Sequence, residues 1–350
     1  MNLGHCLEMA GSALLALLDP EKDLMPTDGY EVAHDLGRWW DAVLRLEEAI
    51  GFVIPAELEA ASLRNLERLT DNPDRLLMNR LDVPWLCDRA KINPHNFRES
   101  LLAFGDLVRR RQSAWAREAG LQLVRSMDRC LKADGSFDFT QLGCWGQMPH
   151  TDDPSHTEPK RDGWFDGTAT SGRSLEALVW FFEATGEPLV LDVARRIAQH
   201  HLRFSTNRDG SVRSEIVSRA NVGHNHSYHG TLRGLLRFGL LTGQKEYVDV
   251  VEATYRHADH GRIVMESGWA PHDLGMLRSW RCGWRWRPVA WICWTMWNAM
   301  SGLGFSRHNS PKTTCAAFRS ARSSRENEAP GGFMALRTRA SGALRTCWPP

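Results

Sequence analysis

The feature of this sequence that most constrains its fold is an internal repeat of a two-helix unit. Residues 174–200 recur at 231–257, and each copy has an apolar-striped helix, a Thr-Gly turn and a second apolar-striped helix. A glycine at that turn suits the left-handed conformation that often ends a helix. The copies share Leu175/Leu232, Leu178/Leu235, Phe181/Phe238, Thr185/Thr242, Gly186/Gly243, Asp192/Asp249, Val193/Val250 and His200/His257.

The same unit occurs twice more towards the N-terminus. Residues 37–51 align on 172–186 and lead into a second helical pattern, AELEAASLRNLERL, and residues 97–131 carry a helix pair without the glycine turn. Repeated helix pairs predict an all-α array. The polar connections 133–170 and 203–227 are too long for a plain solenoid. They therefore indicate a closed ring, an (α/α) toroid with one decorated face, which is incomplete in this chain.

Three segments resemble the six-hairpin glycosidase superfamily, in particular uncharacterised bacterial members related to β-L-arabinofuranosidase-type and unsaturated-glucuronyl-hydrolase-type enzymes. The segments are HDLGRWWDAVLRLEEAIGF, HNHSYHGTLRGLLRFGLLTG and ESGWAPHDLG. The resemblance spans roughly residues 30–275 and implies an (α/α) toroid that hydrolyses an oligosaccharide or glycoside. Arabinofuranosidase-type enzymes hold zinc with cysteines and a glutamate. Since Ser267 and Gly268 follow Glu266 with no cysteine nearby, we expect no metal and no other cofactor.

Glycoside hydrolysis usually needs two carboxyl groups, one of them held protonated. Glu266 lies near Trp269, whose apolar ring suits a general acid, and Asp273 or Asp166 is then the base or nucleophile. Each has a structural alternative: an ion pair with arginine for Glu266, and a helix cap for Asp273 and Asp166.

Histidine and aromatic residues gather at the predicted mouths of the hairpins, where they could contact a sugar. The segment 224–230 suits sugar binding or proton transfer, with a transition-metal site or loop capping as alternatives. Trp40 aligns with core leucines and is expected to be packing. The substrate-contact candidates are His34, Asp35, Trp39, Trp164, His224, His226, Tyr228, His229, Trp269 and His272.

The C-terminal part of the chain differs from the rest. Residues 276–350 hold 12 Lys and Arg against Glu326 and Glu328, with five tryptophans between Trp284 and Trp297. Tryptophan and methionine have one codon each, and the same bases read two positions later spell an amphipathic helix. We interpret 276–350 as an out-of-frame, poorly structured tail, after an N-terminal segment 1–29 and a toroid over 30–275. A genuine basic, Trp-rich arm is the alternative.

The remaining features bound the function. No apolar run is long enough to span a bilayer, and scattered cysteines without Cys-x-x-Cys spacing indicate a reducing compartment, so we expect a cytoplasmic protein without membrane or nucleic-acid partners. Glycoside hydrolysis is the first hypothesis. The rivals are a polysaccharide lyase with Tyr228 or a histidine as base, a non-catalytic helical-repeat binding protein, and an inactive damaged copy.

Overall fold

The computed structural model describes residues 3–26, 32–78, 96–144, 171–213 and 225–257. The chain divides into two units, Met1 with Phe305–Pro350 and Asn2–Gly304, and every described residue belongs to the second. The predicted tail at 276–350 lies outside the described residues.

Four helical hairpins follow one another along the described chain. They are α2 (Val32–Ile50) with α3 (Ala56–Leu69), α4 (Asn96–Arg111) with α5 (Ala114–Cys130), α8 (Ser171–Thr185) with α9 (Pro188–Phe204), and α11 (Asn225–Thr242) with α12 (Lys245–Arg256). This succession confirms the predicted all-α class, an (α/α) toroid of helical hairpins. The hairpin of α4 and α5 is the helix pair predicted at residues 97–131.

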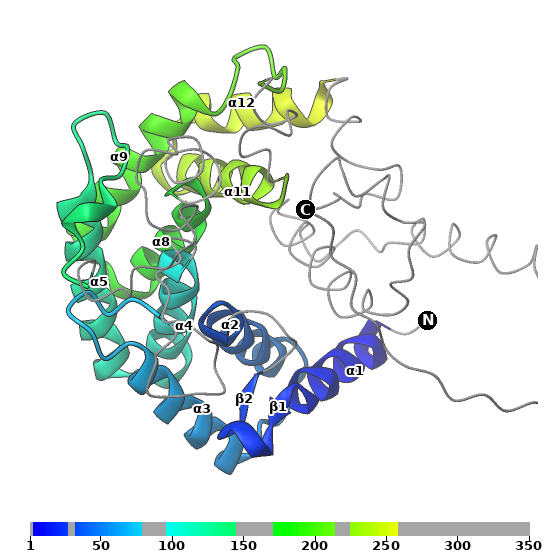
Figure 1. Cartoon of the computed structure of the whole chain (residues 1–350). Coiled ribbons are helices and arrows are strands. Elements are labelled where there is room, and N and C mark those ends of the chain that lie inside the picture. Colours follow the sequence, from blue (N-terminus) through cyan, green and yellow to red (C-terminus); the bar gives the residue numbers. More distant parts are fainter. Residues whose placement is uncertain (1–2, 27–31, 79–95, 145–170, 214–224, 258–350) are drawn as a thin grey trace, which may run out of the picture. The chain divides into compact units, whose positions relative to one another are not determined.

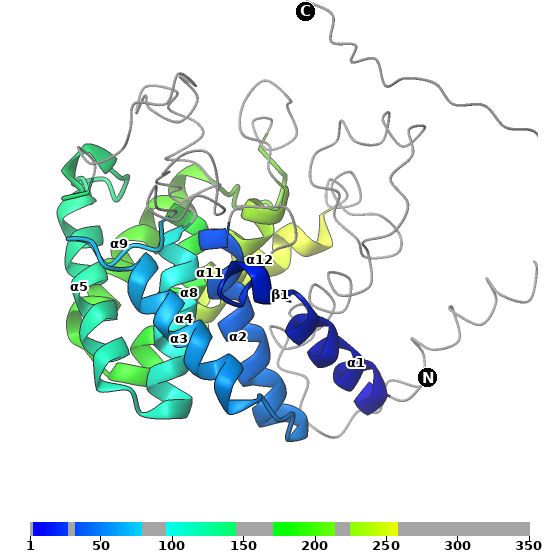
Figure 2. The ribbon, with the colours of Figure 1, turned by 60° about the horizontal axis from the view of Figure 1, so that its bottom comes forward.

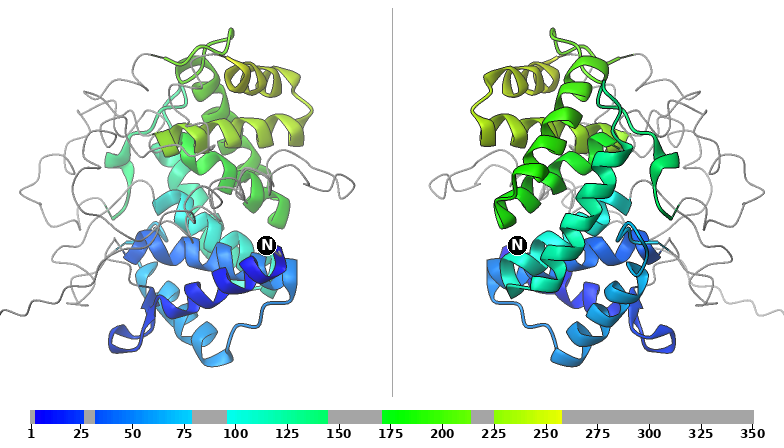
Figure 3. Two further views of the ribbon diagram at one scale, coloured as in Figure 1. Left: turned by 90° about the vertical axis from the view of Figure 1, so that its right-hand side faces the viewer. Right: turned by 90° about the vertical axis from the view of Figure 1, so that its left-hand side faces the viewer.

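The first helix of each hairpin forms an inner layer. Helices α2, α4, α8 and α11 pack on one another in that order, and the second helices cover them from outside (Figure 1). The inner and outer helices run alongside one another in Figure 2. Figure 3 shows the two ends of this array, with α11 and α12 at one and α2 at the other.

The N-terminal segment packs against the first hairpin. Helix α1 (Leu3–Ala16) contacts α2, and it is followed by a short antiparallel pair, β1 (Leu18–Asp19) with β2 (Met25–Pro26), around the turn η1 (Pro20–Lys22). A further short turn, η2 (Phe139–Gln141), packs on α5.

The turns between paired helices follow local chemistry. Gly51, Gly186 and Gly243 have φ values of 69°, 70° and 68°, which confirms the left-handed helix ends expected from their sequence positions. The α4–α5 turn has no glycine: Gln112 adopts φ 53°, and the Ser113 side chain caps α5 by accepting a hydrogen bond from the Ala116 amide.

One glycine permits a close approach that matters for the site. A Cβ atom on Gly37 would lie 2.3 Å from the carbonyl oxygen of Glu99, nearer than packed atoms allow. Gly37 therefore lets the backbones of α2 and α4 meet. Polar side chains on the inner faces of these two helices are consequently brought together in a buried setting.

Candidate functional site

Most of the loop residues predicted from the sequence cannot be placed. Outside the described residues lie Asp166, Glu266, Asp273, Trp164, His224, Trp269 and His272. His34 and His226 fall in the first turns of α2 and α11, but their side chains are also outside the described part. The roles proposed for these residues stay predictions.

Trp39 is a packing residue. Its side chain is buried, its indole N–H donates to the Leu14 carbonyl at 3.0 Å, and its ring meets that of Trp40 edge to face at 5.2 Å. The ring is enclosed between α1 and α2, which corrects the prediction of an open stacking platform at Trp39. Trp40 is buried as expected, and Asp35 is partly exposed in the first turn of α2.

Tyr228 and His229 face α12. Tyr228 is fully buried with its hydroxyl next to that of Thr254, and burial raises its pKa to about 12. His229 places Nδ1 3.3 Å from the Tyr255 hydroxyl. A buried phenol with a raised pKa is a poor base at neutral pH, so Tyr228 joins α11 to α12 and does not suit proton abstraction.

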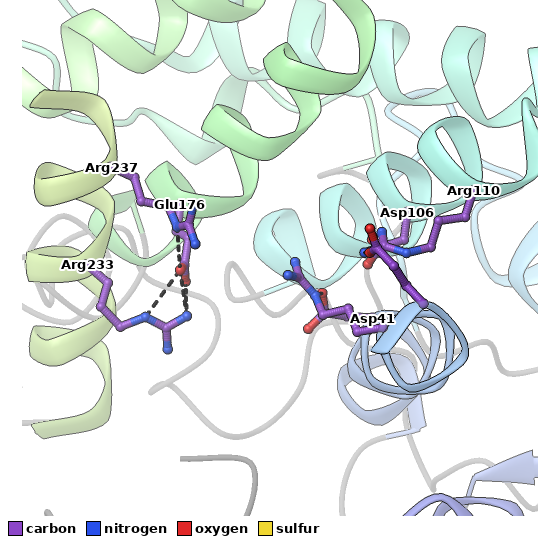
Figure 4. A network of polar contacts seen from close by, with 8 residues as sticks. Asp41, Asp106, Arg110, Glu176, Arg233 and Arg237 are labelled. Carbon is purple, nitrogen blue, oxygen red and sulfur yellow. Dashed lines mark hydrogen bonds and ion pairs between the residues drawn. The ribbon is translucent and has the colours of Figure 1, made fainter. Parts of the chain in front are cut away.

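A set of charged side chains on the inner helices forms a group that the sequence did not indicate (Figure 4). We call it the inner charged cluster. Glu176 and the arginines from α11 form one half, and Asp41 lies with Asp106 and Arg110 in the other. The cluster comprises Asp41, Arg45, Arg98, Glu99, Asp106, Arg110, Glu176, Arg233 and Arg237. Buried charge of this density is unusual and, in an enzyme, is frequent at functional sites.

The carboxyl groups of Asp41 of α2 and Asp106 of α4 lie within hydrogen-bonding reach of each other. They are 1% and 5% exposed. Two ionised carboxylates only accept hydrogen bonds, so the pair needs a proton between them. The Oδ2 atom of Asp106 is buried with no hydrogen-bond donor among the described residues, and a proton on this carboxyl group supplies the missing bond. The pair therefore shares one proton.

The surrounding charges assign that proton to Asp106. Burial opposes ionisation of Asp41, but the hydrogen-bonded Arg45 guanidinium and the more distant Arg98 leave its pKa below the ordinary value. Burial and the negative charge of Asp41 raise the pKa of Asp106 well above the usual range, despite Arg45 and Arg110. Arg110 hydrogen-bonds Asp106 but is also paired with Glu48. Asp41 is thus the carboxylate and Asp106 the acid.

The other half of the cluster is centred on Glu176. Arg233 donates to both carboxylate oxygens of Glu176, at 2.6 and 2.5 Å, and Arg237 lies at 3.5 Å. Burial lowers the pKa of Arg237, an effect that Glu176 opposes. Both arginines come from α11 and are partly exposed.

Trp180 connects the two halves. The Arg45 guanidinium lies 3.9 Å from its ring centroid and the Arg237 guanidinium 4.8 Å, distances typical of cation–π contacts. Trp180, Arg45, Asp106 and Arg110 line one narrow hollow, which has room for about one water molecule. The protonated carboxyl group therefore borders a cavity with aromatic and cationic walls.

The repeat explains why these residues meet. The alignment of 37–51 on 172–186 places Asp41 opposite Glu176 and Arg45 opposite Trp180, and the next repeat places Arg233 and Arg237 at the same two levels. Asp106 joins the second level from α4, since it shares the hollow with Arg45 and Trp180. Adjacent inner helices thus present their polar side chains at matching heights.

The described residues contain neither a metal-ligand cluster nor a membrane-spanning helix. No group of three or more His, Cys, Asp or Glu side chains suited to a metal ion occurs among the residues whose positions are given. No helix in the same part of the chain is long and apolar enough to cross a bilayer.

Comparison with known proteins gives structural neighbours only. No family model matches the sequence, and no curated protein matches it. One similar structure is of UGL carrying a substitution, with dGlcA-Glc-Rha-Glc: identity is 15%, the match covers 86% of this chain and 82% of that one, and the TM-score is 0.45. Another is unsaturated glucuronyl hydrolase, responsible for the degradation of glycosaminoglycan, from Bacillus sp. GL1, at 16% identity, 86% and 83% coverage and TM-score 0.46.

These neighbours are of the type that the sequence resembles, and the likeness concerns the fold. One fold supports many unrelated functions, so the function depends on the side chains of this chain.

Proposed function

We propose that this protein is a carbohydrate-active enzyme that hydrolyses glycosidic bonds by carboxyl acid/base catalysis, with Asp106 as the general acid. The observation that carries the proposal is the buried contact between the Asp41 and Asp106 carboxyl groups, which raises the pKa of Asp106, beside the hollow lined by Trp180. A carboxyl group whose pKa is raised well above its ordinary value suits protonation of a sugar leaving group.

In the proposed reaction, Asp106 transfers its proton to the glycosidic oxygen as the bond from that oxygen to the anomeric carbon breaks. In an inverting reaction, a water oxygen then adds to the anomeric carbon and the proton of that water passes to a second carboxylate. In a retaining reaction, the second carboxylate bonds the anomeric carbon first, and the water that later displaces it returns its proton to Asp106. The Asp106 anion that remains is stabilised by Arg110, which already bonds it. Asp41 keeps its negative charge and orients Asp106.

Asp41 is too close to Asp106 to be the second carboxylate. The two acting carboxyl groups stand about 5–5.5 Å apart in retaining enzymes and about 6.5–9.5 Å apart in inverting ones, whereas these two lie within hydrogen-bonding reach of each other. The candidates for this role are Asp273 and Asp166, as the sequence predicts, together with Glu266. The sequence predicts Glu266 as the acid, and with Asp106 as acid it becomes a candidate base or nucleophile.

The proposed substrate is an oligosaccharide or glycoside, which the family resemblance of the hairpins also favours. The partly exposed guanidinium group of Arg237 can donate to sugar oxygens beside the Trp180 ring. The lyase alternative loses its best candidate base, because Tyr228 is buried and burial raises its pKa to about 12.

The test uses the full chain with aryl glycosides that differ in leaving-group acidity, together with an oligosaccharide panel. Loss of general acid catalysis typically costs about 10²–10⁴-fold. We expect Asp106→Asn to lose about this much on poor leaving groups and far less on a dinitrophenyl group, which departs without protonation. Asp249→Asn, an exposed carboxylate change on α12, is the control. An Asp106→Asn variant that is fully active, or equally impaired on every leaving group, would contradict the assignment.

A further inference from the structure

We infer that Glu48, a surface carboxylate one turn after Arg45 on α2, is a positioning residue that sets the pH at which Asp106 releases its proton, by competing for the guanidinium of Arg110. The inference rests on the proposed function only for its catalytic consequence. The coupling between the carboxyl groups of Glu48 and Asp106 can be measured without any substrate.

The geometry is a chain of three groups that leads from solvent to the buried pair. One nitrogen of Arg110, Nη1, donates to Asp106 Oδ1, and the other, Nη2, donates to Glu48 Oε2. Arg110 is largely buried, while the Glu48 side chain is 53% exposed. A single guanidinium thus divides its charge between a buried acid and a surface carboxylate.

This division weakens the pull of Arg110 on Asp106. An arginine hydrogen-bonded to a carboxyl group favours its ionised form, and a second carboxylate on the same guanidinium offsets part of that effect. Glu48 also lies 3.4 Å from Arg109, and although burial opposes its ionisation, the combined attraction of Arg110, Arg109 and Arg45 lowers its pKa. Glu48 is therefore ionised wherever Asp106 must hold its proton.

The other charged groups around Asp106 stay the same when Glu48 changes. From α2 and α4 these are Asp41, Arg45, Arg98 and Arg109, and from α8 and α11 they are Glu176, Arg233 and Arg237. Arg109 and Arg45 also attract Glu48, whereas Arg110 bonds both Glu48 and Asp106 and is the direct link between them.

Glu47 provides a matched control. It precedes Glu48 in the same helix and is also a partly exposed carboxylate, but its partner is Arg111, bound at 2.6 and 2.8 Å. Glu47→Gln and Glu48→Gln remove the same charge from adjacent positions. Only Glu48→Gln releases the arginine that bonds Asp106.

The experiment follows the Asp106 carboxyl carbon by NMR in the full chain labelled with ¹³C-carboxyl aspartate, with the signal assigned by its loss in Asp106→Asn. We expect Glu48→Gln to move the titration midpoint of Asp106 to lower pH by about one pH unit, and Glu48→Lys to move it further. Glu47→Gln, which acts on Arg110 through charge without a hydrogen bond to it, should move the midpoint much less. Circular dichroism confirms that each variant is folded.

An unchanged midpoint in Glu48→Gln and Glu48→Lys, or an equal shift in Glu47→Gln, overturns the role of Glu48. The pH dependence of kcat/KM then separates this inference from the proposed function. If Asp106 is the acid, Glu48→Gln moves the alkaline limb of the kcat/KM profile to lower pH together with the titration midpoint of Asp106. A shifted titration with an unmoved limb upholds the coupling through Arg110 and overturns Asp106 as the general acid.

Discussion

Replacing Asp41 and Asp106 one at a time by asparagine should affect stability very unequally, although the two carboxyl groups lie within hydrogen-bonding reach of each other and are similarly buried. Asp106 carries the proton, so Asp106→Asn exchanges one neutral group for another, and its amide N–H can donate to Asp41 as the acid O–H did. We expect a change in unfolding free energy within about 1 kcal/mol at pH 7.

Asp41→Asn removes a charge that Arg45 needs. The Arg45 side chain is 15% exposed and hydrogen-bonds Asp41, and breaking a buried ion pair costs about 3–5 kcal/mol when nothing replaces the lost partner. Two effects reduce this cost: Asp106 can ionise once Asp41 is neutral, and Arg45 keeps its contact with Trp180. We therefore expect a loss of about 2 kcal/mol, a roughly thirtyfold change in the unfolding equilibrium.

The pH dependence of the unfolding free energy gives a second test of the proton assignment with the same variants. The folded pKa of Asp106 is raised, so above the ordinary value of 3.8 the unfolded chain releases this proton first. The contribution of Asp106 to stability is therefore lost as pH rises from that value through the folded pKa. Asp106→Asn should lack this loss, and its stability relative to wild type should increase with pH.

The assay is urea unfolding followed by circular dichroism at several pH values, with midpoints compared at equal m. Asp249→Asn, whose partner Lys245 is exposed, controls for the loss of one surface charge. The proton assignment is refuted if Asp106→Asn costs as much as Asp41→Asn at pH 7, or if its stability follows the same pH dependence as wild type.

Two further predictions concern other buried charges. Glu176→Ala leaves Arg233 and Arg237 without their shared carboxylate and should cost about 3 kcal/mol, whereas Asp249→Ala in an exposed pair should cost under about 0.5 kcal/mol; similar urea midpoints would contradict this contrast. The pKa of His201 is lowered well below 6.5, mainly by burial, so its contribution to stability is lost as pH falls below about 6.5 and the unfolded chain takes up the proton. His201→Gln should flatten that fall in the unfolding free energy, and an unchanged slope between pH 7 and 5 would disprove the attribution.

The helical hairpins could be predicted because their signals are local. Apolar spacing marks the buried stripe of each helix, and a glycine marks its end. The pattern over 37–51 therefore predicts α2, and Gly186 and Gly243 adopt the expected left-handed conformation. Trp40 was correctly assigned to the core from its alignment with Leu175. Trp39 was not, because its enclosure depends on α1, which lies outside the repeat.

The inner charged cluster could not be predicted with the same tools. Asp41 and Asp106 stand within helices, where a charged residue ordinarily marks a solvated face. Their pairing depends on the register of α2 against α4, which Gly37 permits by its close approach to Glu99. The sequence instead predicts the site in the histidine- and tryptophan-rich loops, because their composition alone suggests sugar chemistry.

One signal of the site was nevertheless present in the repeats. Positions that pack outward keep their character between copies, as Leu178 and Leu235 do. Positions that face inward change: Glu176 becomes Arg233, and Trp180 becomes Arg237. The outward position always meets the same kind of partner, the second helix of its own hairpin, so each repeat needs the same apolar residue. The inward position meets a different neighbour at each step around the inner layer, so its chemistry can differ from copy to copy. In a chain built from repeats, the helical positions where the copies disagree in charge are therefore the ones to examine first for a site.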